Sequence, residues 1–234
     1  MFAHPDDESL SAGGLLARAA SRGARTAVVT ATWSRQTARG DELAAALRHL
    51  GAGEPRFLGY ADARVPESAP GAPRLLDAPL DQAVERLVAI IREFRPEVVV
   101  THDPYGAPTG HPDDVQTYRI TTLAVEAAAL ELTYPAAGEP WRTTALMLAT
   151  YPVSTLPLLD ELVGHRRALF GTPDDSVTDV IDVTTWLDVK VAAILAHASE
   201  VERGAAPGIV NALSSADRAR LLSTEWYIRR APRA

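Results

Sequence analysis

The sequence predicts an α/β fold: a Rossmann-like three-layer sandwich in which a mostly parallel sheet lies between two layers of helices. Apolar runs such as 26–32 and 97–101 are continuous and rich in β-branched residues, which is typical of strands buried on both faces. These runs alternate with segments of helical periodicity, and strands joined by helices form parallel sheets. The length of 234 residues suits one domain, so we expect residues 1–234 to fold together.

In the first half of the chain, strand and helix signals alternate from the start. Met1-Phe2-Ala3 is shorter than an ordinary strand of about 5–6 residues, so the first strand is expected to be truncated. Gly13-Gly14 lowers the propensity of the first helix, and close packing of that helix on the sheet is the expected reason. The expected elements are a helix over 10–21, a strand over 26–32, a helix over 41–50, a short strand over 56–58, a long loop over 60–79 and a helix over 80–94.

The second half continues the same alternation. Pro112 is typical of the first turn of a helix, so a helix is expected from Asp113 onward, directly after the loop 102–110. The expected elements are a strand over 97–101, a helix over 113–132, a strand over 145–150, a short helix over 158–170, a strand over 179–183, and helices over 186–203 and 215–222.

Composition narrows the class of protein and its partners. The net charge of −7 and the pI of about 5.4 argue against a nucleic-acid partner. The sequence has neither a long apolar run nor a charged-then-apolar leader, so no transmembrane helix and no signal peptide are expected. The absence of cysteine excludes disulfides and thiolate metal ligands and suits a cytoplasmic protein. A small molecule is therefore the expected partner, and the oligomeric state is left open.

The tetrapeptide His-Pro-Asp-Asp occurs twice, at residues 4–7 and 111–114. Each copy precedes an expected helix and follows an expected strand, and parallel sheets bind ligands at the carboxyl ends of their strands, so both copies are expected at one edge. Imidazole and carboxylate are ligands that catalytic Zn²⁺ accepts, with three protein ligands and one open position. Asp can instead cap a helix start. That alternative explains one copy better than two.

The sequence Ala-His-Pro-Asp-Asp-Glu at residues 3–8 resembles the LmbE/PIG-L family of zinc-dependent N-acetylglucosaminyl deacetylases. The resemblance covers nearly the whole chain and is strongest to the branch that contains the mycothiol-pathway deacetylase and the mycothiol S-conjugate amidase. The first motif is specific, and the others are weaker individually. The weaker motifs are Arg39–Leu47, Leu58-Gly59-Tyr60, residues 99–104, residues 110–114, Lys190 with residues 196–199, and Glu225-Trp226-Tyr227.

The resemblance implies a role for each residue of the two motifs. His4 and Asp7 correspond to metal ligands of the family, and Asp6 corresponds to its general base. His111 corresponds to the residue that stabilises the tetrahedral oxyanion and can protonate the leaving amine, and Asp113 to the carboxylate that orients it. These roles are chemically consistent, because bound zinc acidifies water and polarises an amide carbonyl while a facing imidazole offsets the developing charge.

The second motif departs from the family pattern. The family usually has His-Pro-Asp-His there, and its last His is the third metal ligand, whereas this chain has Asp114. The resemblance therefore implies the ligand set His4, Asp7 and Asp114. Carboxylate oxygen is a harder ligand than imidazole nitrogen, so the cofactor is expected to be Zn²⁺ or another divalent metal. Thr109 stands where the family has Tyr, and Tyr105 is the nearest replacement.

The expected function is removal of an acetyl group from an N-acetylglucosaminyl-type substrate by metal-activated water. Arg39 resembles a substrate-contacting Arg of the family, and an exposed Arg at a helix start is the alternative. Two other functions stay open: an amidase of a mycothiol-like S-conjugate, and a binding protein of the same fold that has lost catalysis. The intact motif at residues 4–7 favours an enzyme.

The remaining histidines and two tryptophans have simpler interpretations. His49 is expected on an exposed helix face, and His165 beside two arginines is expected in solvent. His197 is expected to pack or to hydrogen-bond rather than to bind metal. For His102, a role in contact with the metal ligands, not with the metal itself, stays open. Trp33 and Trp186 are expected in the core or at its rim.

Overall fold

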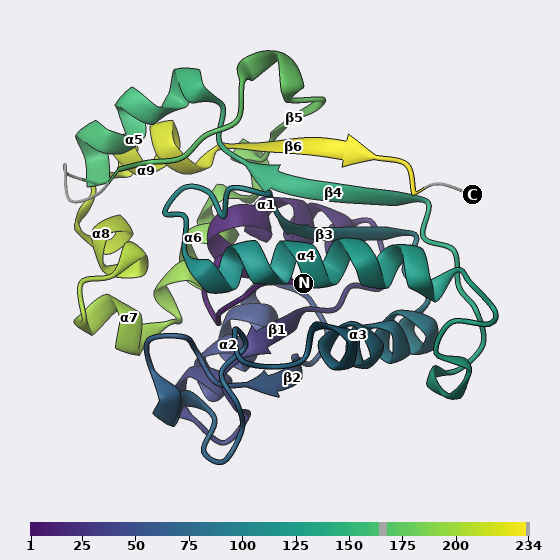
Figure 1. Ribbon diagram of the computed structural model, residues 1–234. Coiled ribbons are helices and arrows are strands. Elements are labelled where there is room, and N and C mark those ends of the chain that lie inside the picture. The colour runs from purple at the N-terminus through teal and green to yellow at the C-terminus, as the bar shows by residue number, and fades with distance from the viewer. Residues whose placement is uncertain (164–167, 233–234) are drawn as a thin grey trace.

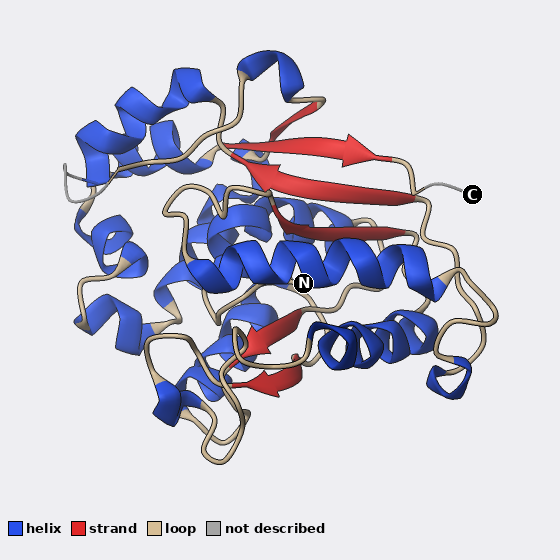
Figure 2. Ribbon diagram, viewed as in Figure 1, coloured by secondary structure: helices blue, strands red, loops and turns tan. Residues whose placement is uncertain are grey.

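The computed structural model describes residues 1–163 and 168–232 and has three layers (Figures 1 and 2). Helices α3 (Leu80–Phe94) and α4 (Pro112–Ala128) cover one face of the strands. Helices α1 (Asp7–Ser21), α2 (Ala38–Leu50) and α6 (Leu187–Leu195) cover the other. The predicted α/β class is therefore confirmed. No helix in the described part of the chain is long and apolar enough to cross a membrane.

The strands form two sheets, and the larger one is mixed. In the smaller sheet β1 (Val29–Thr32) and β2 (Arg56–Tyr60) are parallel. In the larger sheet the order is β3-β4-β6-β5, with β3 parallel to β4 and β6 antiparallel to both of its neighbours. The bounds in that sheet are Val98–His102 for β3, Ala145–Thr150 for β4, Asp179–Asp182 for β5 and Thr224–Arg230 for β6.

The expectation of a mostly parallel sheet is thus only partly met, and the reason lies in the connection to β6. Helix α9 (Ser215–Leu222) is followed after one residue by Thr224, and Trp226 pairs with Thr150 at the carboxyl end of β4. Strand β6 therefore begins at the edge where β4 ends and has to run back antiparallel. A parallel strand would have needed a long crossover to the other edge.

The first three residues join the two sheets. Phe2 forms a parallel bridge with Thr30 of β1, and its carbonyl accepts from Ala31 N at 2.9 Å. On the other side, the backbone nitrogen of Met1 donates to Val100 O of β3 at 2.7 Å. The short segment 1–3 therefore lies between β1 and β3 and delivers His4 to the carboxyl edge of both sheets.

Apolar side chains fill the space on both sides of the strands. Leu146 and Leu148 of β4 pack in the cluster with α3 and α4, whereas Met147 and Ala149 pack with Phe2 and α1. This alternation makes β4 a central strand buried on both faces. Four short helices lie beyond the carboxyl edge: α5 (Leu156–Val163), α7 (Ala198–Glu202), α8 (Ala206–Ala212) and α9. The 3₁₀ turns are Pro66–Ser68, Pro135–Ala137, Val153–Thr155, Asp174–Ser176 and Thr184–Trp186.

Several element boundaries differ from the prediction. The expected helix over 186–203 is interrupted between α6 and α7, and the expected helix over 158–170 is α5, with residues 164–167 outside the described part. Strand β6 was not expected, because its buried Glu225 hides the alternation of apolar and polar residues. In the fold, Lys190 pairs with this carboxylate at 2.7 Å.

Candidate metal centre

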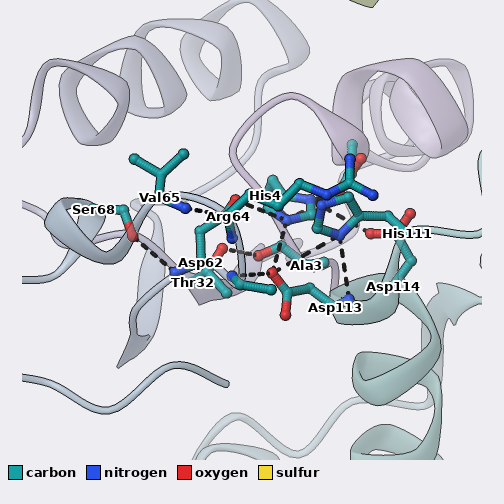
Figure 3. A network of polar contacts seen from close by, with 12 residues as sticks. Ala3, His4, Thr32, Asp62, Arg64, Val65, Ser68, His111, Asp113 and Asp114 are labelled. Atoms are coloured by element: carbon teal, nitrogen blue, oxygen red, sulfur yellow. Dashed lines mark hydrogen bonds and ion pairs between the residues drawn. The ribbon is translucent and has the colours of Figure 1, made fainter. Parts of the chain in front are cut away.

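Both His-Pro-Asp-Asp motifs lie at the carboxyl edge of the strands, as expected, and each begins a helix. His4 follows the segment 1–3, and Asp7 is the first residue of α1. His111 is the N-cap of α4, and its ring accepts a hydrogen bond from Asp113 N at 3.2 Å. Figure 3 shows His4 and the second motif facing one another across the site.

The ring of His4 is the centre of a cluster of carboxylates. Its Nδ1 lies 3.1 Å from Asp7 Oδ2 and 3.4 Å from Asp114 Oδ1. Its Nε2 lies 3.2 Å from Asp62 Oδ2 and 3.3 Å from Asp113 Oδ2. Four carboxylates thus surround one imidazole in a buried site, which leaves an excess of negative charge.

The pKa values of the cluster reflect this imbalance. Burial lowers the pKa of His4, but hydrogen bonds to Asp113, Asp62 and Asp7 outweigh it and raise that pKa well above its usual value. Burial raises the pKa of Asp114 to about 7, against the opposing charge of His102. A carboxylate that is as deeply buried as that of Asp114 stays ionised only when a cation lies nearby. The cluster therefore favours binding of a positive ion.

Among the described residues, two groups of side chains could hold a metal ion, and they share His4. In the first, ligand atoms of His4, Asp7 and Asp114 all lie within 4.8 Å of one another. The second group is His4, Asp62, His111 and Asp113. In the described part of the chain, Asp114 Oδ1 is buried without a hydrogen-bond partner. One imidazole and two carboxylates with an orphaned oxygen fit a divalent cation with an open coordination position.

Asp6 lies beside this cluster in a strained backbone conformation. Its φ of 124° and ψ of −30° are rare for a residue with a side chain, and such strain costs about 1–3 kcal/mol. Burial raises its pKa to about 7, against the charge of Arg39. A carboxylate with a pKa near neutrality can both accept and release a proton at physiological pH.

Arg39 lies in α2 and is buried rather than exposed. Its guanidinium contacts Asp6 Oδ1 at 3.1 Å, Glu200 Oε1 at 3.2 Å and the carbonyl of Pro5. It also stacks on Trp33, 4.4 Å from the ring centre. The alternative of an exposed helix-start Arg is therefore wrong, and contact of Arg39 with a substrate stays a prediction.

The tautomer of His111 follows from its hydrogen bond. Because Nδ1 accepts from Asp113 N, the ring proton of the neutral form lies on Nε2. Burial, with the charge of His4, lowers the pKa of His111 to about 4. The neutral ring can thus donate a hydrogen bond from Nε2 to a negative oxygen.

Asp113 is placed differently from the expectation that its carboxylate orients His111. Its Oδ2 is 3.9 Å from His111 Nδ1, beyond hydrogen-bond distance. The same oxygen accepts from Ala63 N at 2.9 Å and lies 3.3 Å from His4 Nε2. The carboxylate therefore holds His4 and the loop after β2, whereas the hydrogen bond from Asp113 to the His111 ring comes from its backbone.

Sequence reasoning missed one member of the cluster, Asp62. It lies two residues after the end of β2, and its Oδ1 accepts from Arg64 N and Val65 N at 2.6 and 3.2 Å. These two hydrogen bonds form a turn that fixes the start of the long loop 60–79. The available signal was an acidic residue within two positions of the end of a strand, and Asp103 directly after β3 has a similar position.

The remaining predictions for single residues are mostly confirmed. His49 is exposed, and His197 is buried and hydrogen-bonds to Glu8. His102 lies behind the cluster, where Nε2 accepts from Ala3 N at 3.0 Å. Trp186 is half-buried at the rim of a core cluster. His165 lies outside the described residues. Tyr105 is 47% exposed, and its replacement of the family Tyr stays a prediction.

A family model described as PIG-L, GlcNAc-PI de-N-acetylase, matches residues 1–125, which is more than half of the chain and includes both motifs. The chain belongs to the PIG-L family. The match runs from the first residue through most of α4, so the matched region includes Asp62 and His102 as well as the motifs.

Curated relatives in the PIG-L family extend the likeness over most of the chain. A 1D-myo-inositol 2-acetamido-2-deoxy-alpha-D-glucopyranoside deacetylase from Rhodococcus erythropolis is 39% identical, over 86% of this chain and 80% of that protein. A protein of the same name from Rhodococcus jostii is also 39% identical, over 97% of this chain and 89% of that protein.

Solved structures show the same fold. The conserved protein TT1542 from Thermus thermophilus has a TM-score of 0.68 and 25% identity, over 100% of this chain and 94% of that one. The N,N'-diacetylchitobiose deacetylase from Pyrococcus horikoshii has a TM-score of 0.67 and 17% identity, over 99% of this chain and 82% of that one. The second likeness concerns the fold alone.

Proposed function

We propose that this protein is a metal-dependent N-deacetylase that hydrolyses the acetamide of an N-acetylglucosaminyl substrate. The observation that supports it most is the arrangement of His4, Asp7 and Asp114 around one point, beside Asp6 and His111. The names of the curated relatives give the substrate class, an N-acetylglucosaminyl inositol. Acetate and a free amino sugar would be the products.

The proposed cofactor is Zn²⁺ or another divalent metal, held by His4, Asp7 and Asp114. When bound, such an ion supplies a more acidic water and a polarised substrate carbonyl. Asp6 then accepts the proton of the attacking water. The Nε2 proton of His111 hydrogen-bonds to the carbonyl oxygen as it becomes negative, and Asp113 keeps His4 in place. The proton on Asp6 passes to the nitrogen of the leaving amine, which completes the hydrolysis.

Two alternatives have less support. An amidase of a mycothiol-like S-conjugate would use the same chemistry, but the curated relatives with 35–39% identity carry the deacetylase name. A binding protein without catalysis would not need a strained carboxylate with a raised pKa next to the candidate metal ligands. We therefore favour the deacetylase.

Other parts of the proposal concern the whole chain. The bridge through residues 1–3 supports a Rossmann-like arrangement in which both sheets work as one layer. We propose that residues 1–234 act as one domain with a small-molecule partner. A cytoplasmic location and the lack of a nucleic-acid partner stay predictions from the sequence.

The test is acetate release by the purified protein from the N-acetylglucosaminyl inositol, with metal content measured on the same sample. Asp6→Asn should keep the metal and lose about 10²–10⁴ in kcat, the usual value of a general base. Wild-type kcat in Asp6→Asn would overturn the assignment of the base. Cleavage of an S-conjugate without acetate release would favour the amidase, and metal binding without any hydrolysis would favour the binding protein.

A further inference from the structure

The strained backbone of Asp6 has a specific partner on its N–H group. That group donates to Glu8 Oε2 at 3.0 Å, although Glu8 is only two residues further along the chain. The Asp6 carbonyl meanwhile accepts from Ser9 N and Leu10 N, both at 3.1 Å, as α1 begins. Both polar groups of the Asp6 peptide backbone are therefore fixed at the point where φ is 124°.

Glu8 is held by a residue from the other end of the chain. It is fully buried, and its Oε1 accepts from Ser9 Oγ at 2.5 Å and from His197 Nε2 at 3.0 Å. His197 is also fully buried and lies directly before α7. A buried carboxylate needs such a partner, because an unpaired charge in the interior is costly. His197 thus fixes the carboxylate that fixes Asp6.

The side chain of Asp6 has a second support from the same helix. Arg39 contacts Asp6 Oδ1 at 3.1 Å, and its other terminal nitrogen lies 3.2 Å from Glu200 Oε1. Glu200 lies one turn after His197, in α7. One helix therefore supports both the backbone of Asp6, through Glu8, and its carboxylate, through Arg39.

We propose that Glu8 and His197 are positioning residues for Asp6: together they hold the general base in a backbone conformation that aims its carboxylate at the attacking water. The proposal rests on the role of Asp6 in the proposed function. Neither residue belongs to the group of candidate metal ligands. His197 acts on Asp6 through its hydrogen bond to Glu8 and through its charge. If the hydrogen bond between Glu8 and His197 only stabilised the packing of α1 near α7, the same contacts would form. Their loss would then not affect kcat through Asp6.

The test compares His197→Ala, His197→Gln and the double variant with Asp6→Asn, in kcat, KM, metal content and Tm. We expect His197→Ala to lower kcat roughly 10- to 100-fold, since a misplaced catalytic group can cost that much, with KM and metal content nearly unchanged. His197→Gln can donate from its amide in place of Nε2–H and should recover most of the loss. In the Asp6→Asn background, His197→Ala should have no further effect on kcat.

Ser199→Ala is the matched control, because Ser199 lies on α7 and donates to Glu42 at 2.7 Å without touching Glu8 or Asp6. It should leave kcat unchanged. If His197→Ala lowered kcat by the same factor with and without Asp6→Asn, the proposal would be overturned, and the contact would have a structural role alone. If His197→Ala does not fold, Glu8→Ala takes its place, because it leaves Asp6 N without this acceptor, and unchanged kcat in that variant would also overturn the proposal. Wild-type kcat in Asp6→Asn alone would instead count against the proposed function.

Discussion

At the scale of single residues, Asp114 is the proposed metal ligand that departs from the pattern of the family. It supplies a buried oxygen 3.4 Å from His4 Nδ1 and 3.8 Å from His102 Nε2. A second carboxylate adds negative charge and a harder ligand than imidazole would. The site should therefore bind zinc more weakly than a site with two histidines, and manganese or magnesium should compete better.

The prediction for Asp114 uses two substitutions. Asp114→His should bind zinc more tightly, whereas Asp114→Asn, which keeps the shape and removes the charge, should bind it more weakly, by at least the roughly 10–100-fold that loss of a partner of a ligand costs. Zinc titration and acetate release with different metals measure both effects. Unchanged zinc affinity in both variants would place Asp114 outside the ligand set.

His111 should act on the reaction and not on metal binding. Its Nδ1 already accepts from Asp113 N, so only Nε2–H faces outward as a donor. His111→Ala should lower kcat by about 10²–10³, the usual cost of one oxyanion donor, with metal content unchanged. Metal analysis of the purified variant decides the matter, since loss of the ion would make His111 a ligand.

At the scale of elements, helix α1 packs closely against neighbouring residues at Gly14, where there is no room for a side chain. A Cβ built on Gly14 would lie 2.4 Å from Val183 Cβ, which no side chain tolerates. At Gly13 the nearest atom is Lys190 Cγ at 3.1 Å, part of a long side chain. The close packing expected at Gly13-Gly14 is found at Gly14, but against Val183, directly after β5, and not against a strand of the sheet.

Gly14→Ala should destabilise the fold by about 1–3 kcal/mol through overpacking, despite the higher helix propensity of alanine. Gly13→Ala is the control and should change the free energy of unfolding by less. Denaturant unfolding of both variants tests this. Val183→Gly, which removes the Cβ that would lie 2.4 Å away, should restore part of the stability in the Gly14→Ala background, because the two sites are coupled through one contact. Equal stability of the two glycine variants would contradict the packing argument.

At the scale of the whole molecule, the centre joins four segments that are far apart in the chain. Residues 4–7, the loop after β2, the end of β3 and the start of α4 meet there. An ion bound by this cluster would stabilise the folded state only, because the unfolded chain does not bring the ligands together. Removing the ion should then lower the stability of the entire domain.

A ligand at 100 times its Kd adds about 2.7 kcal/mol, which is roughly 5–10 °C in Tm for a domain of this size. We expect thermal unfolding with excess Zn²⁺ or Mn²⁺ to show such a rise over the same protein with a chelator. Asp7→Asn should lose the rise. An identical metal-dependent shift in wild type and Asp7→Asn would mean that the ion binds elsewhere.

Much of this protein could be predicted from its local sequence. Continuous apolar runs, helical periodicity, Pro112 and the two repeated tetrapeptides each depend on neighbouring residues, and they predicted the α/β class, the edge where the motifs meet and the part of the centre that the two motifs supply. The chemistry of His and Asp is likewise set by residue type. These features needed no knowledge of how distant segments pack.

The tertiary structure decided what depends on contacts between distant segments. Strand β6 runs antiparallel because α9 ends beside β4, and Glu225 can lie in the interior because Lys190 reaches it. Asp62 joins the centre because the loop after β2 folds back to Asp113. Arg39 is buried and Asp6 is strained because helix α7 and the residue before it, far along the chain, supply Glu200 and His197. Burial and pairing of charges depend on partners that only the folded chain brings within reach, so a local pattern does not encode them.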